Sequence, residues 1–196
     1  MRLFAAVLPP AGAVRELAVA ADRLRGVPGA EALRWTGRSG WHFTLAFYGE
    51  VAEATAAGLT ERLTRAAHRT APFELALRGG GHFGGRALWA GATGDLDGIR
   101  LLAARAEAAG RKAGVAMEEH RAYRPHLTLA RSRAGADFTP YLAALDGFTG
   151  RTWTVRELCL VRSNLPASGT PGERPRYETL AALPLGAGDS AGRTAG

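Results

Sequence analysis

The sequence predicts an α+β fold with two lobes, in which two pseudo-symmetric antiparallel sheets face each other across a central cleft and helices cover the outer faces. Three observations predict it. The hydrophobic periodicity alternates along the chain between two and about 3.6, which is typical of mixed strands and helices. The 196 residues, 46% of them hydrophobic, suffice to bury one substantial core. A short strand-like motif also occurs twice. We therefore expect residues 1–185 to form a single bilobal domain.

Runs of apolar, aromatic and β-branched residues bounded by glycine or proline predict the strands. In chain order they cover residues 3–8, 41–48, 73–77, 87–91, 126–131, 153–162 and 176–183. Apolar residues at helical spacing predict the helices, and the first of these is stopped by Gly26-Val27-Pro28-Gly29. The helices cover residues 14–24, 51–66, 96–106 and 141–145.

Two segments contain few residues that could join a core. Glycine dominates residues 79–85, which we expect to form a hairpin-like loop; they lack the Lys-Ser/Thr pair of a phosphate-binding P-loop. Residues 186–196 are small or polar, so we expect a disordered tail there.

Charge and cysteine content narrow the function classes. The formal net charge is +7, and Lys112 is the only lysine, so the excess is arginine. Such a charge favours phosphate-bearing partners, although a composition biased toward Ala, Gly and Arg could also produce it. Cys159 is the only cysteine, which excludes an internal disulfide and a cysteine-rich metal site. No apolar run reaches membrane-spanning length, and the N-terminal apolar stretch is too short for a signal peptide, so we expect a cytoplasmic protein without a membrane partner.

The repeated motif is the most informative feature. His42-Phe43-Thr44-Leu45-Ala46 recurs as His126-Leu127-Thr128-Leu129-Ala130, each on a predicted strand. Because residues i and i+2 of a strand share a face, each motif presents one imidazole and one hydroxyl on the same side. Two such strands facing each other would present two imidazoles and two hydroxyls to one bound group.

This constellation suits the cleavage of a phosphodiester. In-line displacement needs one group to accept a proton while another donates one on the opposite side, and histidine can do either near neutral pH. Threonine hydroxyls can donate hydrogen bonds to the non-bridging oxygens. Neither a metal nor another cofactor is required. Spacing alone still leaves open a zinc hydrolase or a non-catalytic RNA-binding module.

Six stretches of the chain resemble those of a known family. The matching stretches are RLFAA (2–6), WHFTLAFYG (41–49), FGGRALW (83–89), YRPHLTLAR (123–131), LVRSNL (160–165) and YE (177–178). They resemble the two-histidine phosphoesterase superfamily, and within it the RNA 2',3'-cyclic phosphodiesterase family, historically called 2'-5' RNA ligase or LigT. The stretches follow the family order and span most of the chain.

The resemblance implies an activity and a role for several residues. It implies hydrolysis of an RNA 2',3'-cyclic phosphate to a 2'-phosphomonoester, with His42 as proton donor, His126 as proton acceptor and Arg131 on the substrate phosphate. The sequence alone does not fix which histidine has which role. Ligation by the reverse reaction, and hydrolysis of small cyclic nucleotides, are alternatives within the same chemistry.

Further residues are candidates for substrate binding. Arg124 has a claim similar to that of Arg131. Phe47 and Tyr123, with Phe83 and Tyr177, are aromatic residues that could stack on a terminal base. We expect a monomer whose partner is RNA with a 2',3'-cyclic phosphate end or a small cyclic nucleotide.

Overall fold

The structure is a computed structural model, and it describes residues 1–117, 122–165 and 175–186. Its strands are β1 Arg2–Val7, β2 Arg34–Trp35, β3 Phe43–Glu50, β4 Phe73–Phe83, β5 Ala87–Gly94, β6 Leu127–Arg131, β7 Trp153–Val155, β8 Glu157–Asn164 and β9 Arg176–Pro184. Its α-helices are α1 Ala11–Leu24, α2 Glu53–His68, α3 Leu96–Lys112 and α4 Thr139–Leu145. The elements alternate as the periodicity predicts, so the α+β class is confirmed.

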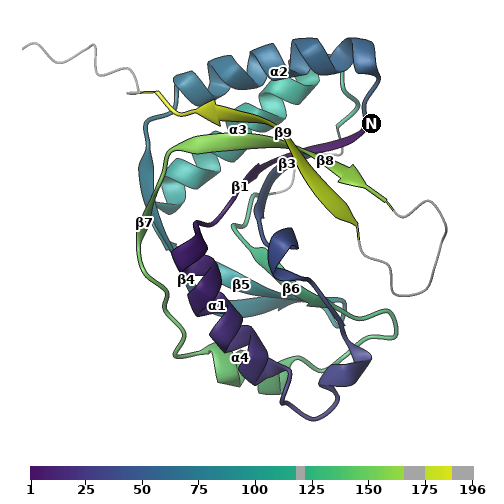
Figure 1. Ribbon diagram of the computed structural model, residues 1–196, viewed down its shortest axis with the longest axis vertical. Coiled ribbons are helices and arrows are strands. Elements are labelled where there is room, and N and C mark those ends of the chain that lie inside the picture. The colour runs from purple at the N-terminus through teal and green to yellow at the C-terminus, as the bar shows by residue number, and fades with distance from the viewer. Residues whose placement is uncertain (118–121, 166–174, 187–196) are drawn as a thin grey trace, which may run out of the picture.

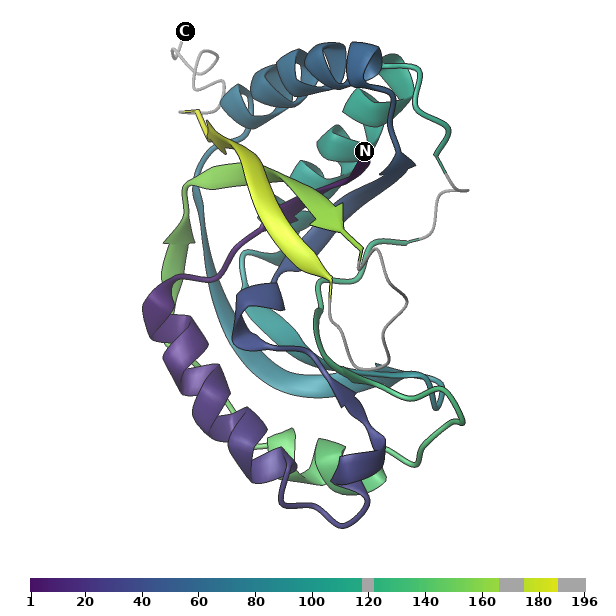
Figure 2. The ribbon, with the colours of Figure 1, turned by 45° about the vertical axis from the view of Figure 1, so that its right-hand side comes forward.

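The strands form one antiparallel sheet in the order β7-β4-β5-β6-β3-β1-β8-β9, with β2 added at β6. The two expected sheets are therefore the two halves of a single sheet, which curls strongly (Figures 1 and 2). The halves join where Phe43 of β3 pairs with Leu127 of β6. Each half contains one copy of the repeated motif beside this junction, so the repeat lies at the centre of the sheet.

Helices cover the outer, convex face of each half. Helices α2 and α3 lie together on the half that contains β3, β8 and β9, and α1 and α4 lie on the half that contains β4 (Figure 1). Each helix has an apolar stripe, such as Leu17, Ala21 and Leu24 of α1, all of which are buried. These stripes and the strand residues on the convex face form the main core, so the helices leave the concave face uncovered.

Two of the sequence predictions about strands are wrong. The single strand expected over residues 153–162 is broken at Arg156, because β7 pairs with β4 at one end of the sheet and β8 pairs with β1 in the other half. The loop expected over residues 79–85 is instead the end of β4, and the turn comes at Gly84, whose φ of 54° favours glycine. A Cβ on Gly81 would lie 2.2 Å from the indole of Trp89, so this glycine makes room for a ring.

Strand β3 begins at Phe43, two residues later than expected, and β6 begins at Leu127, one residue later, so each histidine directly precedes its strand. The tail expected over residues 186–196 falls outside the described residues except for Gly186. In the part of the chain that the structure describes, no helix is both long and apolar enough to cross a membrane.

Candidate active site

His42 is held by its own backbone turn and by two aromatic rings. Its Nδ1 lies 2.8 Å from the carbonyl oxygen of Gly40, a contact that fixes Nδ1 as the protonated nitrogen of the neutral ring. The rings of Phe4 and Tyr177 lie 4.7 and 5.3 Å from the imidazole, centroid to centroid. Nε2 has no partner among the described residues and is left for a ligand.

His126 repeats this arrangement in the other half of the sheet. Its Nδ1 lies 2.8 Å from the carbonyl oxygen of Arg124, again two residues earlier in the chain. The rings of Phe83 and Trp89 lie 4.8 and 5.9 Å from the imidazole. Both histidines therefore present Nε2 as the free nitrogen, with the ring orientation set in the same way.

The pairing of Phe43 with Leu127 places the two motifs side by side in opposite directions. Because residue numbers run in opposite directions in an antiparallel pair, His42 lies on the side of Thr128 and Thr44 on the side of His126. The histidines are also close enough for a charge on His126 to lower the pKa of His42. The structure thus brings the four motif side chains together around one pseudo-twofold axis.

A β-bulge interrupts each motif at the equivalent leucine. On β3, Ala6 pairs with Thr44 and Phe4 with Phe47; on β6, Trp89 pairs with Thr128 and Ala87 with Arg131. Since alternate residues of β1 and β5 share a face, the extra residue turns the third position after each threonine back toward the concave face. Arg131 therefore lies on the same face as Thr128, although its offset in the sequence is odd.

Burial is the main influence on both imidazoles. It lowers the pKa of His42 to about 4, opposed in part by the Gly40 carbonyl and assisted by the charges of His126 and Arg131. Burial also lowers the pKa of His126; the Arg124 carbonyl opposes this shift, and the Arg131 and Arg124 guanidinium groups add to it. Both imidazoles are therefore neutral at pH 7 in the free protein, and Arg131 acts on both.

The threonines and Phe47 are accessible from the concave face. Thr44 and Thr128 are half-buried, and neither hydroxyl has a hydrogen-bond partner among the described residues. Phe47 is 44% exposed, and the Arg2 guanidinium lies 4.9 Å from the centre of its ring. Both threonines can therefore donate to a bound anion, and Phe47 offers an open aromatic face.

The remaining candidates differ in their surroundings. Arg124 is exposed and adjoins His126 through its carbonyl, whereas Tyr123 packs against the core with a buried hydroxyl that has no partner among the described residues. Their roles stay predictions. Phe4 and Trp89, for which the sequence predicts only a place in a strand, also reach the site. Strand alternation could have identified Phe4, because its neighbours Leu3 and Ala5 face the core.

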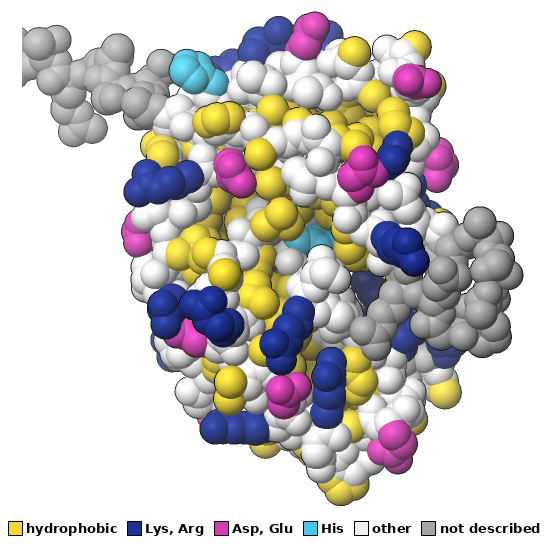
Figure 3. Space-filling view, viewed as in Figure 1, with side chains coloured by type: hydrophobic (Ala, Val, Ile, Leu, Met, Phe, Trp, Pro, Cys, Tyr) yellow, Lys and Arg dark blue, Asp and Glu magenta, His cyan; other side chains and the backbone are white. Residues whose placement is uncertain are grey.

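The concave face is hollowed, as the space-filling view shows: a histidine lies within the hollow, apolar side chains line much of it, and arginine or lysine side chains stand below it (Figure 3). A cavity of about 170 Å³ beside His42 is lined by Gly40, Tyr177, Arg34 and Arg131, among others. No group of three or more His, Cys, Asp or Glu side chains among the described residues is arranged to hold a metal ion. The polar groups at the hollow are thus imidazoles, hydroxyls and guanidinium groups, which suit an anion.

Comparison with known proteins agrees with the geometry. Residues 13–166 match the family described as the 2'-5' RNA ligase superfamily. The chain is 34% identical over 166 residues to an RNA 2',3'-cyclic phosphodiesterase of Geobacillus stearothermophilus. The aligned region covers 82% of this chain and 50% of that relative. The chain thus spans about half of the curated relative it matches.

Solved structures share the fold over nearly their whole length. TT0787 of Thermus thermophilus superposes with a TM-score of 0.73 at 29% identity, covering 96% of this chain and 100% of that one. E. coli LigT complexed with 3'-AMP superposes with a TM-score of 0.73 at 26% identity, covering 94% and 97% of the two chains. The repeated motif, the fold built around it and the family match agree: the chain belongs to the 2'-5' RNA ligase superfamily.

Proposed function

We propose that this protein hydrolyses the 2',3'-cyclic phosphate at the end of an RNA and leaves a 2'-phosphomonoester. The observation that carries the proposal is the pair of imidazoles beside the Phe43–Leu127 junction, each with Nδ1 fixed by a carbonyl and Nε2 free. A phosphodiester bound between the two Nε2 atoms would have a proton acceptor on one side and a proton donor on the other. This is what in-line displacement requires.

In the proposed reaction, His126 Nε2 takes a proton from water as the water oxygen attacks phosphorus. The bond between phosphorus and O3' breaks, and O3' receives the proton of His42 Nε2. The phosphate stays on O2'. One proton is taken and one is given, so the total charge of the histidine pair is unchanged, and exchange with solvent restores the starting protonation of each ring. The assignment of the two roles rests on the family resemblance.

Thr44, Thr128 and Arg131 would stabilise charge on the phosphate. The threonine hydroxyls on the concave face have no partner in the described part of the chain, and the bulge at Leu129 turns Arg131 to the same side. A guanidinium can donate two parallel hydrogen bonds to two non-bridging oxygens. Hydrogen bonds that strengthen as charge develops lower the barrier without moving a proton.

His42 can donate a proton only if it is first protonated, and the bound substrate must favour that protonation. Burial lowers the pKa of His42 to about 4, so the free protein carries little protonated His42 at neutral pH. An anionic phosphodiester beside the ring favours the charged imidazolium and raises this pKa. The proton would therefore be taken up together with the substrate.

The relatives support the same substrate class. The Geobacillus relative is an RNA 2',3'-cyclic phosphodiesterase, and LigT has been crystallised with 3'-AMP. A metal-independent mechanism fits the donor set, because the two imidazoles can carry out both proton transfers while the hydroxyl groups stabilise charge.

The test is incubation of the purified protein with an oligonucleotide that ends in a 2',3'-cyclic phosphate, with and without EDTA, followed by identification of the product. We expect a 2'-phosphate in both samples. A folded His126→Ala variant is the control for contaminating activity. A 3'-phosphate product would overturn the assigned roles but not the paired chemistry, whereas loss of activity in EDTA with recovery on adding metal would overturn the metal-independent mechanism.

A further inference from the structure

We infer that the protein has a second phosphate site, formed by Arg34 and Arg133 beside Arg131, which binds the RNA on the 5' side of its terminal nucleotide. The inference rests on the proposed function and deepens it: the substrate is an oligonucleotide and not a free cyclic mononucleotide.

Arg34 of β2 pairs directly with Arg131 of β6. Directly opposed residues of an antiparallel pair share a face, so the two guanidinium groups lie on the same side of the sheet. Like charges in this position destabilise a sheet. Arg34, Arg131 and Arg133 are all exposed, and none forms an ion pair with the other described residues. An anion bound between them would remove the repulsion.

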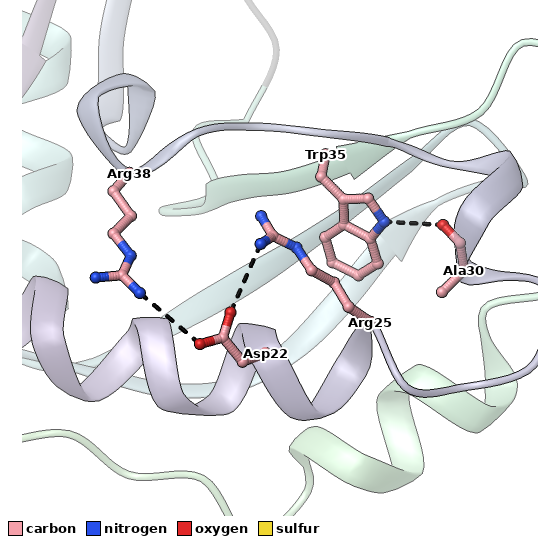
Figure 4. Close-up of polar contacts among 5 residues, drawn as sticks. All are labelled: Asp22, Arg25, Ala30, Trp35 and Arg38. Carbon is pink, nitrogen blue, oxygen red and sulfur yellow. Dashed lines mark hydrogen bonds and ion pairs between the residues drawn. The ribbon is translucent and has the colours of Figure 1, made fainter.

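The segment that carries Arg34 is fixed on both sides (Figure 4). Asp22 of α1 forms ion pairs with Arg25 and Arg38 at 3.6 and 3.7 Å, one on each side of β2 in the sequence. The Arg25 guanidinium lies 5.5 Å from the centre of the Trp35 ring, whose Nε1 donates a 2.9 Å hydrogen bond to the Ala30 carbonyl. The repelling pair is therefore held in place by contacts that do not involve Arg34 itself.

Two cavities meet at this arginine pair. The cavity of about 170 Å³ beside His42 and a larger one of about 520 Å³ both have Arg34 and Arg131 in their linings. The larger cavity also contains Arg133, and its size suits a nucleoside. Its single carboxylate, Asp137, accepts hydrogen bonds from the Thr139 backbone N–H and hydroxyl at 2.9 and 2.6 Å. The lining therefore has a net positive charge.

This arrangement follows the connectivity of RNA. The terminal cyclic phosphate lies at the histidines, and the next phosphate along the chain is one nucleotide away. Arg34, at the wall shared by the two cavities, and Arg133, in the larger one, can bind that phosphate while Arg131 faces the terminal phosphate. The larger cavity then accepts the preceding nucleoside. Arginine suits this role because its planar fork matches two phosphate oxygens.

The experiment compares kcat/KM for uridine 2',3'-cyclic phosphate with kcat/KM for a dinucleotide that ends in the same group. For the wild type we expect a dinucleotide preference of at least roughly tenfold at low salt, since each phosphate contact adds a salt-dependent attraction. Arg34→Gln and Arg133→Gln should each reduce this ratio at least about threefold. Arg15→Gln removes an equal charge from the exposed side of α1, outside the linings of the two cavities, and should leave the ratio unchanged.

A second measurement separates this inference from the proposed function. Binding of a dinucleotide with a terminal 2'-phosphate, compared with uridine 2'-monophosphate, tests the second site without turnover. Tighter dinucleotide binding that Arg34→Gln abolishes supports the site even if neither cyclic substrate is hydrolysed. Equal kcat/KM and equal affinity for the two lengths would overturn the inference and leave the proposed function standing. An Arg100→Gln variant that lowers the ratio while Arg34→Gln does not would place the RNA in a different cavity, lined by Arg100, Arg124 and Trp89, and would also overturn the inference.

Stability gives a further readout that a merely structural arginine would not produce. Because Arg34 and Arg131 repel each other, Arg34→Gln should keep or raise the Tm of the ligand-free protein. Inorganic phosphate should raise the Tm of the wild type more than that of Arg34→Gln. A lower Tm in the variant without ligand would mean that Arg34 stabilises the fold and does not serve a phosphate.

Discussion

Phe43 and Leu127 pair directly where the two halves of the sheet meet, and each follows a histidine whose Nδ1 is bound to a carbonyl two residues earlier. The distance between the two imidazoles is thus set by backbone pairing and not by flexible side chains. Rigid placement of this kind is what acid and base groups acting on one phosphate require.

Acid should destabilise the protein through His42. Burial lowers the pKa of His42 from 6.5 to about 4, so the unfolded chain binds a proton that the folded chain does not. The contribution of this group to stability is fully present above pH 6.5 and is lost as the pH falls toward 4, by about 3 kcal/mol at most. Urea unfolding between pH 7 and pH 4 measures it. The His42→Asn variant should lose less stability over this pH range than the wild type. His68→Asn, at an exposed position of α2, is the matched control. Equal losses in the wild type and His42→Asn would contradict the lowered pKa.

The pH dependence of kcat/KM should be a bell with its maximum below pH 6.5. This parameter reports the free enzyme, and the reactive form holds one proton on the histidine pair. Burial lowers the pKa of both imidazoles, so this form is most abundant at acidic pH. The profile of kcat should lie at higher pH, because the bound phosphate favours protonation. Steady-state kinetics from pH 4 to 9 would decide; a maximum of kcat/KM above pH 7.5 would be incompatible with the lowered pKa of the pair.

Removing either histidine should reduce turnover strongly. We expect His42→Ala and His126→Ala each to lower kcat by at least roughly 100-fold, the lower end of what a positioned acid or base supplies. The double variant should lose much less than the product of the two losses, since both groups act in one transition state. Thr44→Val and Thr128→Val should have smaller effects and keep the bell-shaped profile. Circular dichroism must verify each fold, and a folded His126→Ala enzyme with near-normal turnover would refute the mechanism.

Arg131 should matter for the substrate phosphate. Arg131→Ala is expected to lower kcat/KM by about tenfold or more, and Arg131→Lys should recover only part of it, because an ammonium lacks the planar fork. Arg15→Ala on the exposed side of α1 controls for net charge. If Arg131→Ala proved kinetically silent, Arg124 beside His126 would be the next residue to test.

Gly81 should be intolerant of a side chain. A Cβ there would lie 2.2 Å from the Trp89 ring, which lies 5.9 Å from the His126 ring, so Gly81→Ala should lower stability by about 1–3 kcal/mol and also lower kcat. Gly58→Ala is the matched control, since nothing lies within 4 Å of its Cβ position in α2 and alanine favours helices. Trp89→Leu in the Gly81→Ala background should recover part of the stability. An unchanged Gly81→Ala protein would show that the ring moves freely.

Much of this fold is predictable from the sequence, because periodicity and the repeat depend on local patterns. The helices and the strands around His42 and His126 follow from apolar spacing alone. The facts that could not be predicted are relations between segments. Nothing in the sequence distinguishes a glycine that forms a turn, such as Gly84, from one that accommodates a ring, such as Gly81. Strand β2 is too short to leave a periodic signal.

The orientation of Arg131 is a similar case. In a regular strand, the odd offset from Thr128 would place Arg131 on the opposite face, away from the site. The β-bulge in the pairing with β5 brings Arg131 to the face of Thr128. The sequence places Phe4 and Trp89 in strands but gives neither a role at the site; the structure places both rings against the imidazoles. Sequence patterns predict which residues lie in strands, but the register decides which of them reach the site.

The two bulges have a consequence for direction. A site with a true twofold axis would bind a phosphodiester equally well in either sense, and each histidine would serve as donor half of the time. The bulges bring the third position after each threonine to the same face, and there the two halves differ: one offers the neutral ring of Phe47 and the other the cation of Arg131. This difference breaks the symmetry of the site. In the proposed mechanism, this pair of positions gives the site a direction that the histidines and threonines, which occur in both halves, do not give by themselves.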